Sequence, residues 1–202
     1  MRQALLLESS KELFMFKEKV QMADVCEASV DRGANHSEST SISGYYTVEC
    51  HDASGALKWV ADIENLVTTV GKNLTMDTIL GNSAAGAVVM GLKGVGTADI
   101  ADTQASHVTW DEVGGANAPT YTGTRKTPVF GSATGGVKTT SAAVVFAMTS
   151  SGTVAGCFIN IGGSATKDDT TGTLFSAGDF TAGNKIVTSG DTLSVTYAAT
   201  AA

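Results

Sequence analysis

The sequence predicts a mainly β fold, an antiparallel β-sandwich of jelly-roll type, preceded by an N-terminal helical or extended arm. Three observations predict it. From residue 44 onward, apolar residues recur at every second position, which is the period of a strand with one buried face. Turn-forming Gly, Asn, Asp and Ser separate these segments, and the chain has 23 glycines but only 2 prolines. Helical patterns are few and short, so strands joined by turns favour a sandwich or barrel.

The first 43 residues differ in composition from the rest, because they hold 12 of the 33 charged residues of a 202-residue chain. Ser9-Ser10-Lys11-Glu12 matches the S-x-x-E capping box, which begins helices. Apolar residues then follow at spacings of three and four, which predicts a helix over about 10–28. Residues 31–43 are polar and predict a linker. We therefore divide the chain into an arm with its linker, 1–43, and a β-sandwich domain, 44–202.

The predicted arm helix is apolar on more than one side, so it must dock on its own domain or on a partner. Both alternatives stay open from the sequence, since either would bury the same side chains. The candidate contact residues, toward a partner or another copy of the chain, are Leu13, Phe14, Met15, Phe16 and Val20.

The β domain opens with a predicted hairpin. Tyr46, Val48 and Cys50 alternate with polar residues, 52–55 form a turn, and 56–62 form the return strand. A further strand is predicted within 63–70, centred on 65–68 and ended by Gly71. A short helix is then expected over 72–80, with Leu74 and either Ile79 or Leu80 facing inward.

Four later segments are predicted as strands. Residues 87–92 are apolar throughout and predict a buried strand. Residues 137–149 predict one long strand with two apolar faces, one of them packed on a second sheet. Residues 153–161 predict a strand of the same kind. Residues 192–197 alternate strictly and predict a strand with one solvated face.

Composition also excludes several classes of function. The net charge of −7 argues against direct binding of nucleic acid, which depends on clustered Lys and Arg. No run of 18 apolar residues is present to span a membrane, and charged residues interrupt the N-terminal apolar run too early for a signal peptide. Cys26, Cys50 and Cys157 are far apart and odd in number, which predicts free thiols in a protein made in a reducing cytosol.

The sequence predicts no enzyme, no cofactor and no metal site. The three histidines have no ligand-like spacing, and the acidic pair Asp168-Asp169 does not match a calcium loop. Asp102, Ser106 and His107 lie close in sequence, but no nucleophile elbow G-x-S-x-G is present. We instead expect Asp102 and Thr103 to cap a turn above a packed Trp110. The glycine-rich 91–96 segment lacks the G-K-[ST] ending of a phosphate loop and reads as a turn.

An ordered set of segments from about 44 to 198 resembles a widespread group of tailed-bacteriophage virion structural proteins. No single motif is decisive, and the order and spacing of the set carry the resemblance. The segments are 65–68 (NLVT) with Gly71-Lys72-Asn73, Gly91-Leu92, Asp102-Thr103, Ser106-His107, Trp110 with Glu112, Tyr121, Arg125, 172–175 (GTLF), Gly178-Asp179-Phe180 and 189–197 (SGDTLSVTY). The arm of 1–43 departs from shorter members of that group.

The resemblance implies a β-sandwich on the exterior of a phage capsid, with no catalytic residues. We therefore expect a decoration, or cement, protein that is made in the bacterial host cytoplasm and stabilises the shell. Its partners would be the major capsid protein and copies of itself as a dimer or trimer, with Leu13, Phe14, Met15, Phe16 and Val20 as candidate contacts.

Two other classes of function stay open. The first is a receptor- or carbohydrate-binding head or tail fibre protein, in which Tyr45, Trp59, Trp110 and Tyr121 would stack on sugars. The second is a cell-wall or capsule hydrolase, for which the sequence offers no motif.

Overall fold

The computed structural model describes residues 40–202, and Thr40–Ala202 form one compact unit. The predicted helix over 10–28 and the contact candidates Leu13, Phe14, Met15, Phe16 and Val20 lie outside the described residues. The described part is mainly β and all its strand pairs are antiparallel, as the alternating pattern predicts. Its jelly-roll connectivity stays a prediction.

The predicted hairpin is confirmed. It joins β1 (Ile42–His51) to β2 (Leu57–Val67) through a turn in which the Asp52 carboxylate accepts hydrogen bonds from the backbone N–H groups of Ser54 and Ala56, at 2.8 and 2.9 Å. The last two residues of the predicted linker belong to β1, because Ile42 and Ser43 pair with the C-terminal strand. The segment 65–68 is not a separate strand: residues 65–67 continue β2.

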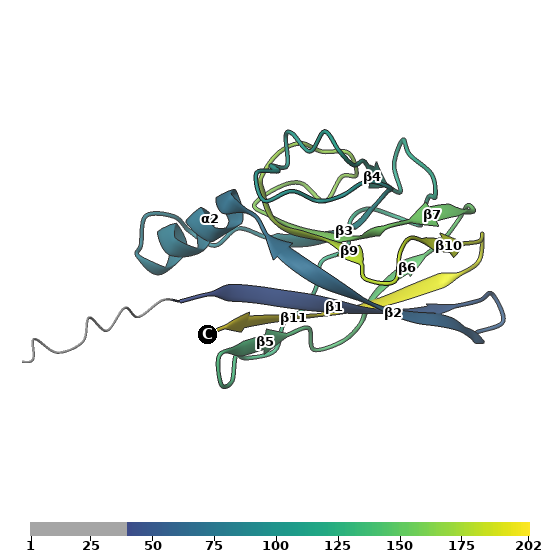
Figure 1. The fold of residues 1–202 in the computed structure, drawn as a ribbon, viewed down its shortest axis with the longest axis horizontal. Coiled ribbons are helices and arrows are strands. Elements are labelled where there is room, and N and C mark those ends of the chain that lie inside the picture. Colours follow the sequence, from purple (N-terminus) through teal and green to yellow (C-terminus); the bar gives the residue numbers. More distant parts are fainter. Residues whose placement is uncertain (1–39) are drawn as a thin grey trace, which may run out of the picture. The chain divides into compact units, whose positions relative to one another are not determined.

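Nine strands form one sheet, and two more form a separate pair (Figure 1). The sheet has the order β4–β3–β8–β9–β2–β1–β11–β5, with β6 also pairing with β11, while β7 pairs with β10. The remaining strands are β3 (Val88–Lys93), β4 (Glu112–Val113), β5 (Val137–Thr139), β6 (Val144–Ala147), β7 (Gly152–Val154), β8 (Gly156–Ile161), β9 (Thr173–Phe180), β10 (Lys185–Val187) and β11 (Thr192–Ala201).

Strand β2 is where the sheet changes partners. Residues Leu57–Asn65 pair with β1 and Ile63–Val67 pair with β9, so β9 joins only at the end of β2. Figure 1 shows β3 and β9 above β1 and β11. One core cluster contains Tyr46 and Val48 of β1 together with Met90 and Leu92 of β3, so the two halves of the sheet face each other across a shared apolar interior. This arrangement is consistent with a β-sandwich.

The predicted short helix is α2 (Thr69–Ile79), which begins earlier than expected. Thr68 is its N-cap, because its hydroxyl accepts a hydrogen bond from the Gly71 N–H at 3.0 Å. Gly71 therefore does not end a strand but lies buried in the first turn of the helix. The expected inward position of Ile79 or Leu80 is wrong, since their side chains are 70% and 74% exposed; Leu74 is half-buried.

Two predicted long strands are interrupted. The segment 137–149 contains β5 and β6, both paired with β11, and its second apolar face is not packed, because Val145 is 48% exposed. The segment 153–161 is split at Ala155 into β7 and β8. The predicted strands over 87–92 and 192–197 are confirmed as β3 and β11.

Candidate functional site

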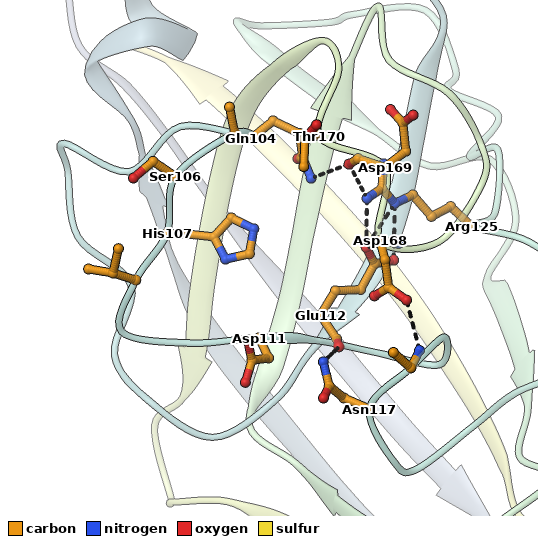
Figure 2. Close-up of a pocket in the computed structure, with 13 residues that line it drawn as sticks. Gln104, Ser106, His107, Asp111, Glu112, Asn117, Arg125, Asp168, Asp169 and Thr170 are labelled. Carbon is orange, nitrogen blue, oxygen red and sulfur yellow. Dashed lines mark hydrogen bonds and ion pairs between the residues drawn. The ribbon is translucent and has the colours of Figure 1, made fainter.

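A pocket of about 420 Å³ opens among the loops that follow β3 and β8 (Figure 2). Its size falls in the range of small-ligand sites. Most of its lining residues have polar side chains, and they come from the stretch 104–125 and from the distant stretch 168–170. The lining residues are Gln104, Ala105, Ser106, His107, Val108, Asp111, Glu112, Ala116, Asn117, Arg125, Asp168, Asp169 and Thr170.

A buried ion pair between Arg125 and Glu112 forms one wall of the pocket. Arg125 Nη2 lies 2.6 Å from Glu112 Oε2, and Nε lies 3.0 Å from Oε1, so the contact is bidentate. The Arg125 side chain has no exposed surface, and that of Glu112 has 4%. Two planar charged groups in register, both removed from water, are the arrangement in which Arg and carboxylate compensate each other best.

The same ion pair connects the loops around it. Arg125 also donates to the carbonyl oxygens of Ser164 and Asp169, at 3.2 and 2.8 Å, and Glu112 Oε2 accepts the Asp168 N–H at 2.9 Å. Asp168 has φ 60°, a left-handed conformation that Asp tolerates better than most residues. Because these bonds use most of the donors and acceptors of the pair, its first role is to hold the pocket loops together.

The segment DTQASH folds as expected. Asp102 Oδ2 accepts hydrogen bonds from Trp110 Nε1 at 2.8 Å and from the Asp99 N–H at 2.9 Å, and Thr103 Oγ1 accepts the Ser106 N–H at 3.0 Å. The His107 ring stacks on Trp110, with centroids 4.0 Å apart. Within residues 40–202, no hydrogen bond joins Asp102, Ser106 and His107 into a catalytic relay, so their closeness in sequence reflects a capped loop.

The free polar atoms of the pocket are mainly acceptors. His107 Nδ1 lies 2.8 Å from the Trp110 carbonyl oxygen, so a neutral ring donates from Nδ1 and leaves Nε2 as an acceptor. The Asp111 carboxylate, Asn117 Oδ1 and Asp168 Oδ1 form no hydrogen bond with any residue of 40–202. Figure 2 shows the His107 ring extending toward the middle of the pocket. Such a lining suits a ligand rich in N–H or O–H donors.

A second ion pair, between a buried Lys93 and an Asp179 whose side chain is 34% exposed, lies near the same loops. Lys93, at the end of β3, contacts Asp179 of β9 at 2.5 Å and lies 5.5 Å from the centre of the Trp110 ring. It also donates to the carbonyl oxygens of Gly94 and Gly96. Burial lowers the pKa of Lys93, while the hydrogen bond from its ammonium group to Asp179 acts in the opposite direction. The pair therefore anchors the turn after β3 to the sheet.

A third ion pair closes the end of the β1–β2 hairpin. Lys58 Nζ lies 2.5 Å from Asp191 Oδ2, and Thr188 donates to the same carboxylate through its N–H at 2.7 Å. Burial alone would raise the pKa of Asp191, but the hydrogen bonds from Lys58 and Thr188 bring it below its ordinary value. Burial and the neighbouring Asp191 raise the pKa of Cys50 to about 11, so its thiol is protonated at neutral pH.

Cys50 and Cys157 are buried free thiols, as the sequence predicts; Cys26 lies outside the described residues. In the part of the chain that the structure describes, no group of three or more His, Cys, Asp and Glu side chains is placed to hold a metal ion. A search of the same residues for a helix long and apolar enough to cross a membrane finds none.

The aromatic residues expected to stack on sugars are not all available. Trp110 and Tyr121 are 3% and 2% exposed, and Trp59 is half-buried against Phe180. Only Tyr45 is open, at 54%. Both belong to core clusters: the burial of Trp110 agrees with the packed position predicted for it, whereas that of Tyr121 was not predicted.

The sequence pattern predicts neither the ion pair of Lys93 with Asp179 nor that of Glu112 with Arg125. Lys93 ends the apolar run of β3, and Glu112 precedes a buried Val113, so each is a charge attached to a core segment. A charged residue next to core residues indicates a buried charge. It does not indicate the partner, because Asp179 and Arg125 lie 86 and 13 residues away.

These contacts describe a domain in which Arg125, Glu112, Lys93 and Asp191 are buried with ionic partners and whose pocket presents hydrogen-bond acceptors. Such an arrangement can hold a donor-rich group by hydrogen bonding. A comparison of the chain with protein-family models, curated proteins and solved structures finds no match in any of the three.

Proposed function

We propose that this chain is a non-enzymatic binding protein of a tailed-bacteriophage virion, a decoration protein that binds the outside of the major capsid protein shell and stabilises it. It would act as a homo-oligomer, dimer or trimer, so that several weak contacts add through avidity.

The observation that carries the proposal concerns the residues of the phage resemblance. Many of them occupy positions on which the fold depends. Glu112 and Arg125 form the buried ion pair, and Asp102 fixes Trp110. A Cβ atom added to Gly178 would lie 2.5 Å from the Glu64 carbonyl oxygen, so only glycine fits between β2 and β9. Many of the residues that carry the resemblance therefore maintain the fold. This supports a structural role shared with the phage proteins over a shared catalytic activity.

The copy number of the protein in purified virions tests this proposal. We expect hundreds of copies per particle, measured by quantitative mass spectrometry against the major capsid protein. The purified protein should also sediment with shells that were assembled without it. Absence from virions, or failure to bind such shells, would overturn the proposal.

A receptor- or carbohydrate-binding fibre protein is the second candidate, and the acceptor-lined pocket favours it. Hydroxyl groups of a sugar would donate to Asp111, Asn117 and His107. Against it stands the burial of Trp110 and Tyr121, which removes two of the four stacking surfaces. A fibre protein would be present in a few to tens of copies per virion, and it would bind a glycan array in a manner abolished by Asp111→Asn with His107→Ala.

A further inference from the structure

Within residues 40–202, β2, β1, β11 and β6 present a four-stranded face that points away from the core and on which most side chains are exposed. The strand registers place its side chains in rows: Val60, Glu49, Ser194 and Val145 lie side by side, as do Asp62, Thr47 and Thr196, and then Glu64, Tyr45 and Ala198. We call this set the outer face.

The outer face combines apolar and acidic groups. Tyr45, Val60 and Val145 are 54%, 50% and 48% exposed, so three large apolar side chains are open to solvent on this face. Glu49, Asp62 and Glu64 are exposed between them. Within residues 40–202, no ion pair involves these three carboxylates, and Lys58 of the same strand is paired with Asp191.

The edges of the sheet offer less for binding. The edge strands β4, β5 and β6 have two, three and four residues, and both residues of β4 are buried. Addition of a partner strand needs a longer open edge, so the face is the better surface for contact.

The charge of the outer face decides what covers it. Two copies placed face to face would bring Glu49, Asp62 and Glu64 against one another, and like charges across an interface cost affinity. A partner with Lys and Arg around an apolar patch would neutralise the same carboxylates while burying Tyr45 and the two valines.

We propose that the outer face is the docking surface of this protein and that it binds a basic, partly apolar surface of another protein, not a second copy of itself. The inference rests on the proposed function, in which that other protein is the major capsid protein. It adds which side of the domain faces the shell and which charges the shell presents.

Charge reversal on the outer face tests the inference. The full-length protein with Glu49→Lys and Glu64→Lys is compared with wild type for binding to shells assembled without it, at about 50 and about 500 mM NaCl. Neither side chain has a hydrogen-bond partner within residues 40–202, so the fold should be unaffected. Asp77→Lys, at an exposed position of α2, is the control for a charge reversal away from the face, and either single variant, Glu49→Lys or Glu64→Lys, matches it in net charge.

We expect the double variant to raise the Kd for shells by about 10-fold or more at the lower salt concentration, and the control to stay within about 2-fold. Wild-type binding should weaken with salt more than that of the double variant. Binding of the double variant equal to wild type would overturn the inference and leave the proposed function standing. No binding by the wild-type protein would overturn both, and self-association lost only in the double variant would assign the face to a second copy.

Discussion

At the scale of single residues, this domain places charge where the sequence pattern suggests apolar core. Arg125, Glu112, Lys93 and Asp191 are all buried, and each has an ionic partner and further hydrogen bonds. A buried ion pair contributes little to stability by itself, because desolvation offsets the attraction. Removing only one partner of the pair destabilises the fold, however, since the remaining charge stays buried without compensation.

Replacing Arg125 with Met should therefore destabilise the domain strongly. We expect a loss of about 3–5 kcal/mol in the free energy of unfolding, because Glu112 would remain buried without its bidentate partner. Urea denaturation followed by tryptophan fluorescence measures it. The matched control is Arg125→Met combined with Glu112→Gln, which should be more stable than the single variant. A single variant within about 1 kcal/mol of wild type would contradict the role given to this pair.

The lowered pKa of Asp191 predicts a pH dependence of stability. A carboxylate whose pKa is lower in the folded state stabilises the fold above its unfolded value of about 3.9, and this contribution is lost as pH falls through the folded value. Asp191→Asn should therefore lose less unfolding free energy than wild type between about pH 5 and about pH 2. Asp77→Asn, at an exposed site, should follow wild type. Equal slopes for Asp191→Asn and wild type would be the contrary result.

Burial of the thiols predicts their reactivity. The pKa of Cys50 is raised to about 11 and that of Cys157 is raised further by burial, so neither forms a thiolate at pH 8. In a Cys26→Ser variant, we expect a thiol reagent at pH 8 to label both residues only after denaturation, as measured by mass spectrometry. Rapid labelling of the native protein would show that these sites are open to solvent.

At the scale of elements, α2 depends on one glycine. Gly71 is buried against β9, and a Cβ atom there would lie 2.3 Å from the Phe175 carbonyl oxygen. The helix begins at this point because Thr68 caps it and itself donates to the Leu174 carbonyl oxygen of β9. The approach of the two backbones therefore decides both where the helix starts and which residue it tolerates.

Gly71→Ala should destabilise the protein, although the same change inside an exposed helix stabilises it by about 1 kcal/mol. We expect a loss of about 1–3 kcal/mol, because α2 must move off β9 to make room for the methyl group. Asn73→Ala, at an exposed position of the same helix, should be neutral or slightly stabilising. Thermal denaturation of the two variants checks the contrast, and a stabilised Gly71→Ala would show that the contact is loose.

At the scale of the whole molecule, the two ends of the described domain are hydrogen-bonded to each other. Ser41 and Ala202 exchange two backbone hydrogen bonds, of 2.7 and 3.0 Å, beside the pairing of β1 with β11. A truncation that respects the fold therefore begins at Thr40, because one that begins at residue 44 would remove the start of β1.

A chain of residues 40–202 should fold with a cooperative thermal transition. If the arm side chains Leu13, Phe14, Met15, Phe16 and Val20 contact the capsid, this shortened protein should bind shells at least about 10-fold more weakly, through the loss of one of two linked contacts. Sedimentation with shells measures the difference. Equal binding by the full and shortened chains would remove the arm from the capsid contact and leave the outer face to account for it.

Alternation of side chains was enough to predict the β1–β2 hairpin and the solvated strand β11, a continuous apolar run predicted the buried strand β3, and turn-forming residues predicted the capped loop around Asp102. Each depends on neighbours in sequence, so a local pattern specifies it. The interruptions in 137–149 and 153–161, the burial of Tyr121, and the pairing of Lys93 with Asp179 depend on contacts between segments far apart in the chain. Only the tertiary structure decided them, because the same run of apolar residues is compatible with one strand or two until its partner strands are known.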